Sequence, residues 1–212
     1  MRPISEVPQP DAPVPVYADS SDLPSGMHRA FVVEAARWGR VRNLTNAIAP
    51  SVSTWQAVIR AEHLYVSLRR VDPSTQAILC LFTSILNGCA YCIDDAAAAA
   101  LKENVTANQL RALHTPSSVF DTKVVAALNY TKWIVQQPSS VPNSVISELR
   151  HHVEEEEFLE LTALVAMKCF WNHFVSALHI LPEGHCTDHE LFRDLCALST
   201  SLREPNNPVE LQ

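Results

Sequence analysis

The chain has 212 residues, of which 47% are hydrophobic and 18% charged, with a formal net charge of −7. This composition is typical of a globular protein that buries a core, and it excludes wholesale disorder. An acidic chain without a run of Lys or Arg is also a poor ligand for nucleic acid or for an anionic membrane surface, so neither partner is expected.

The first 26 residues are rich in proline, with six of the fourteen prolines of the chain. Proline removes a backbone donor and disfavours packed helix, so residues 1–26 are predicted to form an extended tail. This tail has no continuous apolar segment of the secretory type. The longest apolar stretch, residues 77–86, is far shorter than the roughly 20 residues that span a bilayer. Six cysteines without such a signal indicate a reducing, cytoplasmic compartment.

Helical signals follow one another along the rest of the chain. Apolar residues at spacings of three and four predict a helical run from residue 27 that Pro50 ends, and Ser53 is the predicted cap of the next helix. Asp72-Pro73-Ser74 is a strong start signal for a third helix. The residues that follow, 77–82, have no polar face, which predicts a buried helix.

Further helices are expected at residues 89–103, 106–113, 121–137, 144–153 and 154–180, with turns at residues 116–118 and 138–142. No stretch alternates for long enough to predict a strand. The sequence therefore predicts an all-α single domain at residues 27–181, and residues 182–212 are expected to pack peripherally.

A pair of cysteines, Cys89 and Cys92, carries the most distinctive chemistry. Their spacing of three places both at the start of a helix, where side chains are close enough for a disulfide and where free N–H groups favour a thiolate. Two simpler interpretations stay open, because the pair is also compatible with buried core cysteines or with half of a zinc site. The only partner for zinc is the loosely spaced segment 183–189, so no metal is expected. The absence of a phosphate-binding Gly loop and of a dinucleotide fingerprint predicts no cofactor.

The motif Asn-Gly-Cys-Ala-Tyr-Cys-Ile-Asp at residues 87–94, between a buried helix and an Ala-rich one, resembles the alkylhydroperoxidase/carboxymuconolactone decarboxylase family. Residues 149–152 and 157–164 are similar to its closing helix, and residues 170–174 stand where the family often has an aromatic-Asn-Arg element. The resemblance therefore covers roughly residues 40–181. It implies an all-helical bundle that forms homo-dimers, trimers or hexamers. In the peroxidase branch of the family, it implies that Cys92 attacks the peroxide and that Cys89 then forms a disulfide with the oxidised Cys92. The helix dipole alone favours Cys89 as the thiolate.

The chain departs from the peroxidase pattern at two positions. Ala96 stands where that branch has a His, and Ala77, beside Gln76, stands where it has a Glu. Both members of the family's proton relay are therefore missing. A general base is typically worth about 10²–10⁴ in rate, so another group would have to supply it.

Candidates for that role are acidic and imidazole side chains on the flanking helices. Asp95 lies three residues after Cys92, and Glu62 and His63 lie on the preceding helix; each has an ordinary structural interpretation as well. The predicted catalytic residues are Cys89, Cys92, Asp95, His63 and His173, and the predicted substrate-binding residues are Tyr91, Asn172 and Glu62.

Three functions are compatible with the sequence. The first is a thiol-dependent oxidoreductase that reduces peroxides and is restored by an external dithiol protein. The second is a non-redox decarboxylase, isomerase or cyclase that acts on an organic acid or biosynthetic intermediate in the same pocket. The third is a non-catalytic binding protein that keeps the fold. The first two require a small-molecule substrate.

Overall fold

The structure is a computed structural model that describes residues 23–24 and 26–203, so the predicted tail lies almost wholly outside the described residues. Every regular element in the described ranges is helical, which confirms the all-α class. The helices are α1 (His28–Trp38), α2 (Asn43–Ile48), α3 (Val52–Ser67), α4 (Pro73–Asn87), α5 (Ala90–Lys102), α6 (Ala107–Arg111), α7 (Thr122–Gln136), α8 (Asn143–His152), α9 (Glu155–Ala177) and α10 (His189–Arg203). Within this part of the chain, no helix is both long and apolar enough to cross a membrane.

The helical run predicted from residue 27 to Pro50 is wrong in one respect, because it is two helices. Gly39 adopts the left-handed conformation (φ 72°) and ends α1, and α2 begins at Asn43. The predicted cap of the next helix is also displaced. Ser51, not Ser53, caps α3, since its hydroxyl accepts a hydrogen bond from the backbone N–H of Thr54 at 3.2 Å.

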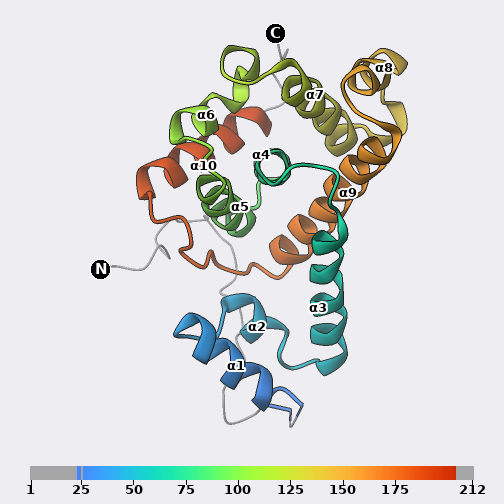
Figure 1. Ribbon diagram of the computed structural model, residues 1–212. Helices are drawn as coiled ribbons and strands as arrows, with labels where there is room; N and C mark the ends of the chain where they lie inside the picture. Colours follow the sequence, from blue (N-terminus) through green and yellow to red (C-terminus); the bar gives the residue numbers. More distant parts are fainter. Residues whose placement is uncertain (1–22, 25, 204–212) are drawn as a thin grey trace.

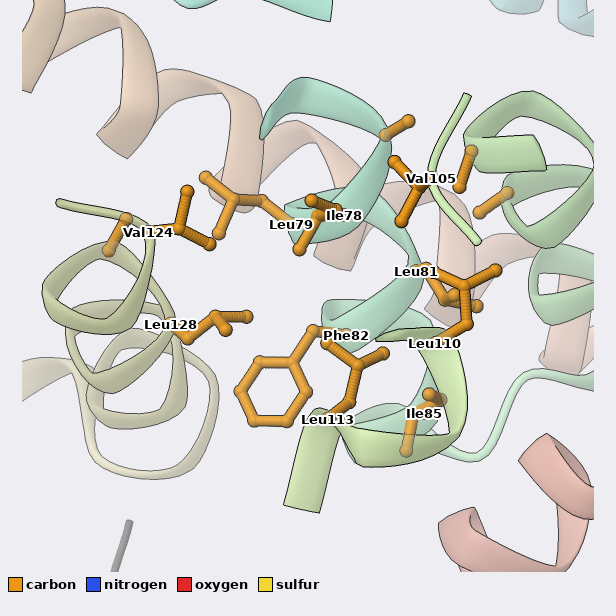
Figure 2. Packing of buried hydrophobic residues seen from close by; sticks show 14 of the residues in the cluster. Ile78, Leu79, Leu81, Phe82, Ile85, Val105, Leu110, Leu113, Val124 and Leu128 are labelled. Atoms are coloured by element: carbon orange, nitrogen blue, oxygen red, sulfur yellow. The ribbon is translucent and has the colours of Figure 1, made fainter. Parts of the chain in front are cut away.

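The apolar helix α4 lies at the centre of the molecule and packs against α5, α7, α9 and α10 (Figure 1). Asp72 caps it as predicted, accepting a hydrogen bond from the backbone N–H of Thr75 at 2.9 Å. Figure 2 shows its buried side chains Ile78, Leu81 and Phe82 among apolar residues of the surrounding helices. The helix that the sequence predicts to be buried is therefore the core of the fold.

The sharp turn between α4 and α5 positions the cysteine pair. Gly88 has φ 71°, a left-handed conformation that strains residues with a Cβ, and it ends α4. Cys89 follows as the N-cap of α5. The cysteines belong to a second apolar cluster, formed where α2 and α3 meet α5 and α9.

The peripheral position expected for residues 182–212 does not apply to α10. Leu191, Phe192 and Leu195 are fully buried in the main core, and the helix packs on α4, α5 and α6. The Ser199 hydroxyl donates to the carbonyl of Ile85 at 2.6 Å. The polar residues that gave this segment its mixed composition lie on the opposite face of an amphipathic helix.

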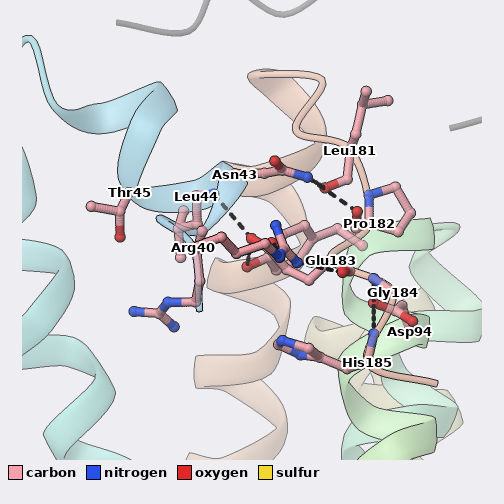
Figure 3. A network of polar contacts seen from close by, with 12 residues as sticks. Arg40, Asn43, Leu44, Thr45, Asp94, Leu181, Pro182, Glu183, Gly184 and His185 are labelled. Carbon is pink, nitrogen blue, oxygen red and sulfur yellow. Dashed lines mark hydrogen bonds and ion pairs between the residues drawn. The ribbon is translucent and has the colours of Figure 1, made fainter. Parts of the chain in front are cut away.

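The segment between α9 and α10 is fastened to α5 and α2 by two buried carboxylates (Figure 3). Asp94 accepts backbone hydrogen bonds from Gly184, His185 and Cys186 at 2.8–3.0 Å. Glu183 accepts from the backbone N–H of Leu44 at 3.2 Å and forms an ion pair with Arg40 at 2.8 Å. These contacts hold the segment between α9 and α10 against α5 and the start of α2.

Candidate functional site

A cavity of about 390 Å³ opens beside the cysteine pair. Its walls come from α3, α4, α5 and α9, together with residues near the start of α2. Apolar side chains share the wall with five charged ones, Arg42, Glu62, Asp95, Glu103 and Lys168. The other lining residues that enter the argument are Leu44, Tyr65, Gln76, Ala77, Cys80, Tyr91, Cys92, Ala96, Ala99, Trp171 and Val175.

The two cysteines occupy different positions relative to this cavity. Cys92 lines it, whereas Cys89 is buried behind the wall and does not. As the N-cap of α5, Cys89 accepts a hydrogen bond through Sγ from the backbone N–H of Cys92 at 3.4 Å. A molecule in the cavity would therefore meet the sulfur of Cys92 first.

The surroundings of the two cysteines favour a single negative charge on the pair. A hydrogen bond from the Cys92 thiol lowers the pKa of Cys89 to about 6, assisted by the Ser176 hydroxyl and the charge of Lys168 and opposed by burial. The same hydrogen bond, with burial, raises the pKa of Cys92. The arrangement places the negative charge on Cys89 at the positive end of α5 and the remaining proton on Cys92.

Asn172, predicted to bind substrate, lies next to the cysteine pair and is not part of the cavity wall. It is buried on α9, its amide donates to the Ser84 hydroxyl at 3.2 Å, and its oxygen accepts from Asn87 at 3.0 Å. Its side chain also hydrogen-bonds Cys92, which lowers the pKa of that thiol in part. Asn172 therefore holds the cysteine side chain, rather than presenting a free amide to a substrate.

Asp95 lines the cavity and hydrogen-bonds the imidazole of His185 at 3.2 Å. Partial desolvation raises the pKa of Asp95, but the hydrogen bond with His185 and the charge of Lys168 lower it overall. The same hydrogen bond raises the pKa of His185. In the sequence, His185 stands out only as part of the loosely spaced segment considered for zinc. Nothing in the spacing of residues 95 and 185 predicts that they meet.

Glu62 also lines the cavity and forms an ion pair with Arg42 at 3.6 Å. Burial raises the pKa of Glu62 despite that pair. Arg42 is held more tightly by Glu34, at 2.7 Å and 3.0 Å from its guanidinium nitrogens. Glu62 is thus a carboxylate at the cavity whose proton affinity is increased.

Tyr91 lines the cavity with its ring, but its hydroxyl donates to Glu183 at 3.0 Å. The polar end of this predicted substrate-binding residue is therefore already occupied. Within the described chain, the two predicted imidazoles do not join the site. His63 and His173 are both exposed and neither lines the cavity, because each occupies the solvent-facing side of its helix.

The two positions where the resemblance implies a proton relay do face the cavity. Ala77 and Ala96 both line it, so the missing Glu and His leave space rather than a rearranged relay. Gln76 does not replace them, since its amide donates to the backbone carbonyls of Leu68 and Val71 at 3.1 Å and 2.8 Å. Among the described residues, no group of three or more His, Cys, Asp and Glu side chains is arranged to hold a metal ion.

Lys168 is the site residue that sequence reasoning missed. It is only 7% exposed, lines the cavity, and interacts electrostatically with both cysteines of the pair. Burial lowers the pKa of Lys168, whereas the charges of the cysteines and of Asp95 raise it, and the net direction is upward. A signal was present, because Lys168 shares a helix face with the buried residues Leu161, Leu164 and Trp171.

The described helices form an all-helical bundle that places a Cys-x-x-Cys pair at the start of α5 beside a cavity. Residues 54–133 match the carboxymuconolactone decarboxylase family. The uncharacterised protein YdfG of Bacillus subtilis strain 168 is 26% identical over 117 residues, which are 54% of this chain and 80% of that protein.

Solved structures confirm the fold. The alkylhydroperoxidase AhpD core of a peroxidase-related protein from Ralstonia eutropha JMP134 superposes with a TM-score of 0.64 at 17% identity, covering 84% of this chain and 93% of the other. A variant of the debrominase Bmp8 in complex with 2,3,4-tribromopyrrole superposes with a TM-score of 0.70 at 16% identity, covering 87% and 98%. At these identities the likeness establishes the fold alone.

Proposed function

We propose that the protein is a thiol-dependent oxidoreductase that reduces peroxides with Cys92 and Cys89. The observation that carries the proposal is the geometry of the pair: Cys92 lines the cavity, and Cys89, whose pKa is lowered by the hydrogen bond from Cys92, lies behind the wall. The match of residues 54–133 to the carboxymuconolactone decarboxylase family and the peroxidase-related structural neighbours support this reaction class.

In this proposal the Cys89 thiolate takes the place of the missing base. A hydroperoxide enters the cavity, and the proton of Cys92 passes along the thiol–thiolate hydrogen bond to Cys89. The Cys92 thiolate attacks the outer peroxide oxygen, the O–O bond breaks, and the departing alkoxide takes up a proton to leave as an alcohol. Cys89 then attacks the Cys92 sulfenic acid, which releases water and forms the disulfide. An external dithiol reduces the disulfide and restores both thiols.

The acid–base alternative, a non-redox enzyme acting on an organic acid, is less well supported. The two imidazoles that could serve it as acid or base, His63 and His173, are exposed. Asp95 remains at the cavity and is paired with His185. Turnover of an organic acid that survives complete thiol blocking would favour this alternative over the redox reaction.

The test of the proposed reaction is peroxide consumption with dithiothreitol as reductant in single-cysteine variants. Cys89→Ser and Cys92→Ser are each expected to fall to background, whereas Cys196→Ser on α10, outside the cavity, keeps wild-type activity. In Cys89→Ser, dimedone should label Cys92 as a sulfenic acid after one peroxide pulse. Full activity in both variants of the pair would end the proposal, and a label on Cys89 in Cys92→Ser would reverse the order of attack.

We further propose that the chain acts as a homo-oligomer in the cytoplasm. Phe170 is exposed on α9 and stacks on Phe174 with ring centroids 6.0 Å apart, an apolar surface that a second copy would cover. All six cysteines are free, which is compatible with a reducing compartment. Light scattering of the purified chain measures the assembly, and a monomer at all concentrations would contradict it.

A further inference from the structure

We propose that Lys168 and Tyr65 form a binding subsite for the carboxylate of an apolar organic acid inside the cavity. This deepens the proposed function, since it predicts that the hydroperoxide reduced by the cysteine pair carries a carboxylate, and it rests on that function only for the reaction. The binding itself is inferred from the surroundings of Lys168 and Tyr65.

Lys168 is a buried cation without a partner. Its ammonium group makes no hydrogen bond or ion pair with any of the described residues, although the side chain is 93% buried. A buried ammonium is costly unless an anion or several acceptors face it. The group lines the cavity, so a ligand there can supply the missing acceptor.

Tyr65 contributes a second unsatisfied group. Its hydroxyl is buried on α3 and has no hydrogen-bond partner in the described part of the chain, while its ring lines the same cavity. A buried hydroxyl without a partner loses the hydrogen bonds that it makes in water. A ligand oxygen that accepts from Tyr65 would restore one of them.

The two residues line the same cavity from different helices, Tyr65 from α3 and Lys168 from α9. Both also interact electrostatically with Cys80, Cys92 and Asp95. An ammonium and a hydroxyl from the wall of one cavity are suited to the two oxygens of a carboxylate. The position also places the rest of such a ligand close to the sulfur of Cys92.

The other cation at the cavity does not compete for this role. Arg42 forms hydrogen bonds with Glu34 and an ion pair with Glu62, so its charge is already compensated. Asp95, a carboxylate that also lines the cavity, is hydrogen-bonded to His185. Among the described residues that line the cavity, Lys168 is therefore the one cation that lacks a counter-charge within ion-pair distance.

The size and the lining of the cavity select an organic acid rather than an inorganic anion. About 390 Å³ is far more space than phosphate or chloride occupies, and Leu44, Trp171, Val175 and the alanines 77, 96 and 99 supply apolar walls. The proposed ligand accordingly has one carboxylate for the subsite and an apolar body for the remaining volume.

The thiolate of the cysteine pair adds a second expectation. Lys168 compensates part of the charge on Cys89, so a carboxylate and that thiolate compete for the same ammonium. Replacing both cysteines by serine removes the thiolate and all thiol chemistry. The double variant Cys89→Ser/Cys92→Ser is therefore expected to bind the carboxylate several-fold more tightly than the reduced wild type.

The experiment compares benzoate with neutral benzamide by isothermal titration calorimetry at pH 7, on wild type and on the double serine variant. Benzoate is expected to bind at least about tenfold more tightly than benzamide, which corresponds to about 1.4 kcal/mol. Lys168→Met should reduce this preference to within about twofold, and Lys168→Arg should keep most of it. Lys102→Met, an exposed lysine on α5 outside the cavity wall, is the matched control and should bind like wild type.

The comparison of benzoate with benzamide on wild type tests the subsite even if Lys168→Met does not fold. No benzoate binding, equal binding of benzoate and benzamide, or binding of inorganic phosphate with no benzoate binding would each overturn the subsite. Because the titrations involve no turnover, they separate the two proposals. Carboxylate binding without peroxidase activity contradicts only the reaction, and peroxidase activity without carboxylate binding contradicts only the subsite.

Discussion

Asp94 and Asp95 are neighbours in the sequence but have opposite roles in the structure. Asp94 is fully buried and accepts three backbone hydrogen bonds from residues 184–186, whereas Asp95 lines the cavity and is 56% exposed. Helical geometry turns successive residues by about 100°, so one carboxylate fastens the α9–α10 segment and the other is available to the site.

Replacing Asp94 by Asn should therefore destabilise the protein much more than the same change at Asp95. Asn offers one oxygen and an amide donor to three N–H groups, so buried donors lose their partners, at a cost of about 2–4 kcal/mol. Asp95→Asn weakens only a partly exposed pair and should cost less than about 1 kcal/mol. Urea unfolding followed by circular dichroism measures both, and equal costs would show that Asp94 is not the anchor.

The pair formed by Asp95 and His185 predicts a pH dependence. The pKa of His185 is raised in the folded state, so its contribution is fully present below about pH 6.5 and is lost as the pH rises through the folded pKa. The pKa of Asp95 is lowered, so its contribution is present above about pH 3.9 and is lost as the pH falls. The pair therefore stabilises the fold most between these two values.

His185→Gln should accordingly lower the free energy of unfolding at pH 5.5, by roughly 0.5 kcal/mol because the pair is partly exposed, and have little effect at pH 9. The exposed His189, at the start of α10, provides the control, since His189→Gln should show no such pH dependence. A destabilisation by His185→Gln that is the same at both pH values would contradict the ion pair.

At the level of single residues, the sequence predicted the cysteine pair and the proximity of Asn172, because a motif and a helix period carried them. It did not predict that His63 and His173 face solvent. Apolar residues that recur every three to four positions define the buried face of a helix only to within about one residue. It also missed the contact of Asp95 with His185, since residues 90 positions apart meet only through tertiary packing.

At the scale of whole elements, the packing of α10 on the central helices is the feature that could not be predicted from the composition of residues 182–212. Leu195 is fully buried against the core, while Thr200 on the same helix is exposed. Leu195→Ala should cost about 2–5 kcal/mol through lost burial and the cavity left behind. Thr200→Ala should stay within about 0.5 kcal/mol of wild type. Thermal or urea unfolding measures both, and a cost below 1 kcal/mol for Leu195→Ala would mean that α10 is only loosely attached.

The start signals of the helices were predictable to different degrees. Asp72-Pro73 and Thr106 combine a capping side chain with a favourable following residue, and both cap the predicted helices. The boundary at Gly39 was missed because the apolar period continues across it, although its φ of 72° ends α1. Ser51 and Ser53 are equally good caps on composition, and only the backbone geometry selects Ser51.

For the whole molecule, the central question is how a thiol pair works without the Glu and His that the resemblance implies. The cavity has alanine at both of those positions and the buried Lys168 in its wall, and Cys89, with its lowered pKa, lies behind that wall. The account holds that the thiolate serves as the base and that the ammonium helps to stabilise it. The overall net charge of −7 does not determine this local balance, which depends on burial around the pair.

The most direct measurement is mass-resolved alkylation of Cys89 and Cys92 as a function of pH, before and after a pulse of an organic hydroperoxide. The account predicts that one thiol of the pair alkylates with a midpoint near pH 6, well below the roughly 8.5 of a free cysteine, and that peroxide converts the pair to a Cys89–Cys92 disulfide. Thiols that react only at or above pH 8.5, together with no disulfide after peroxide, would contradict it and make the pair structural.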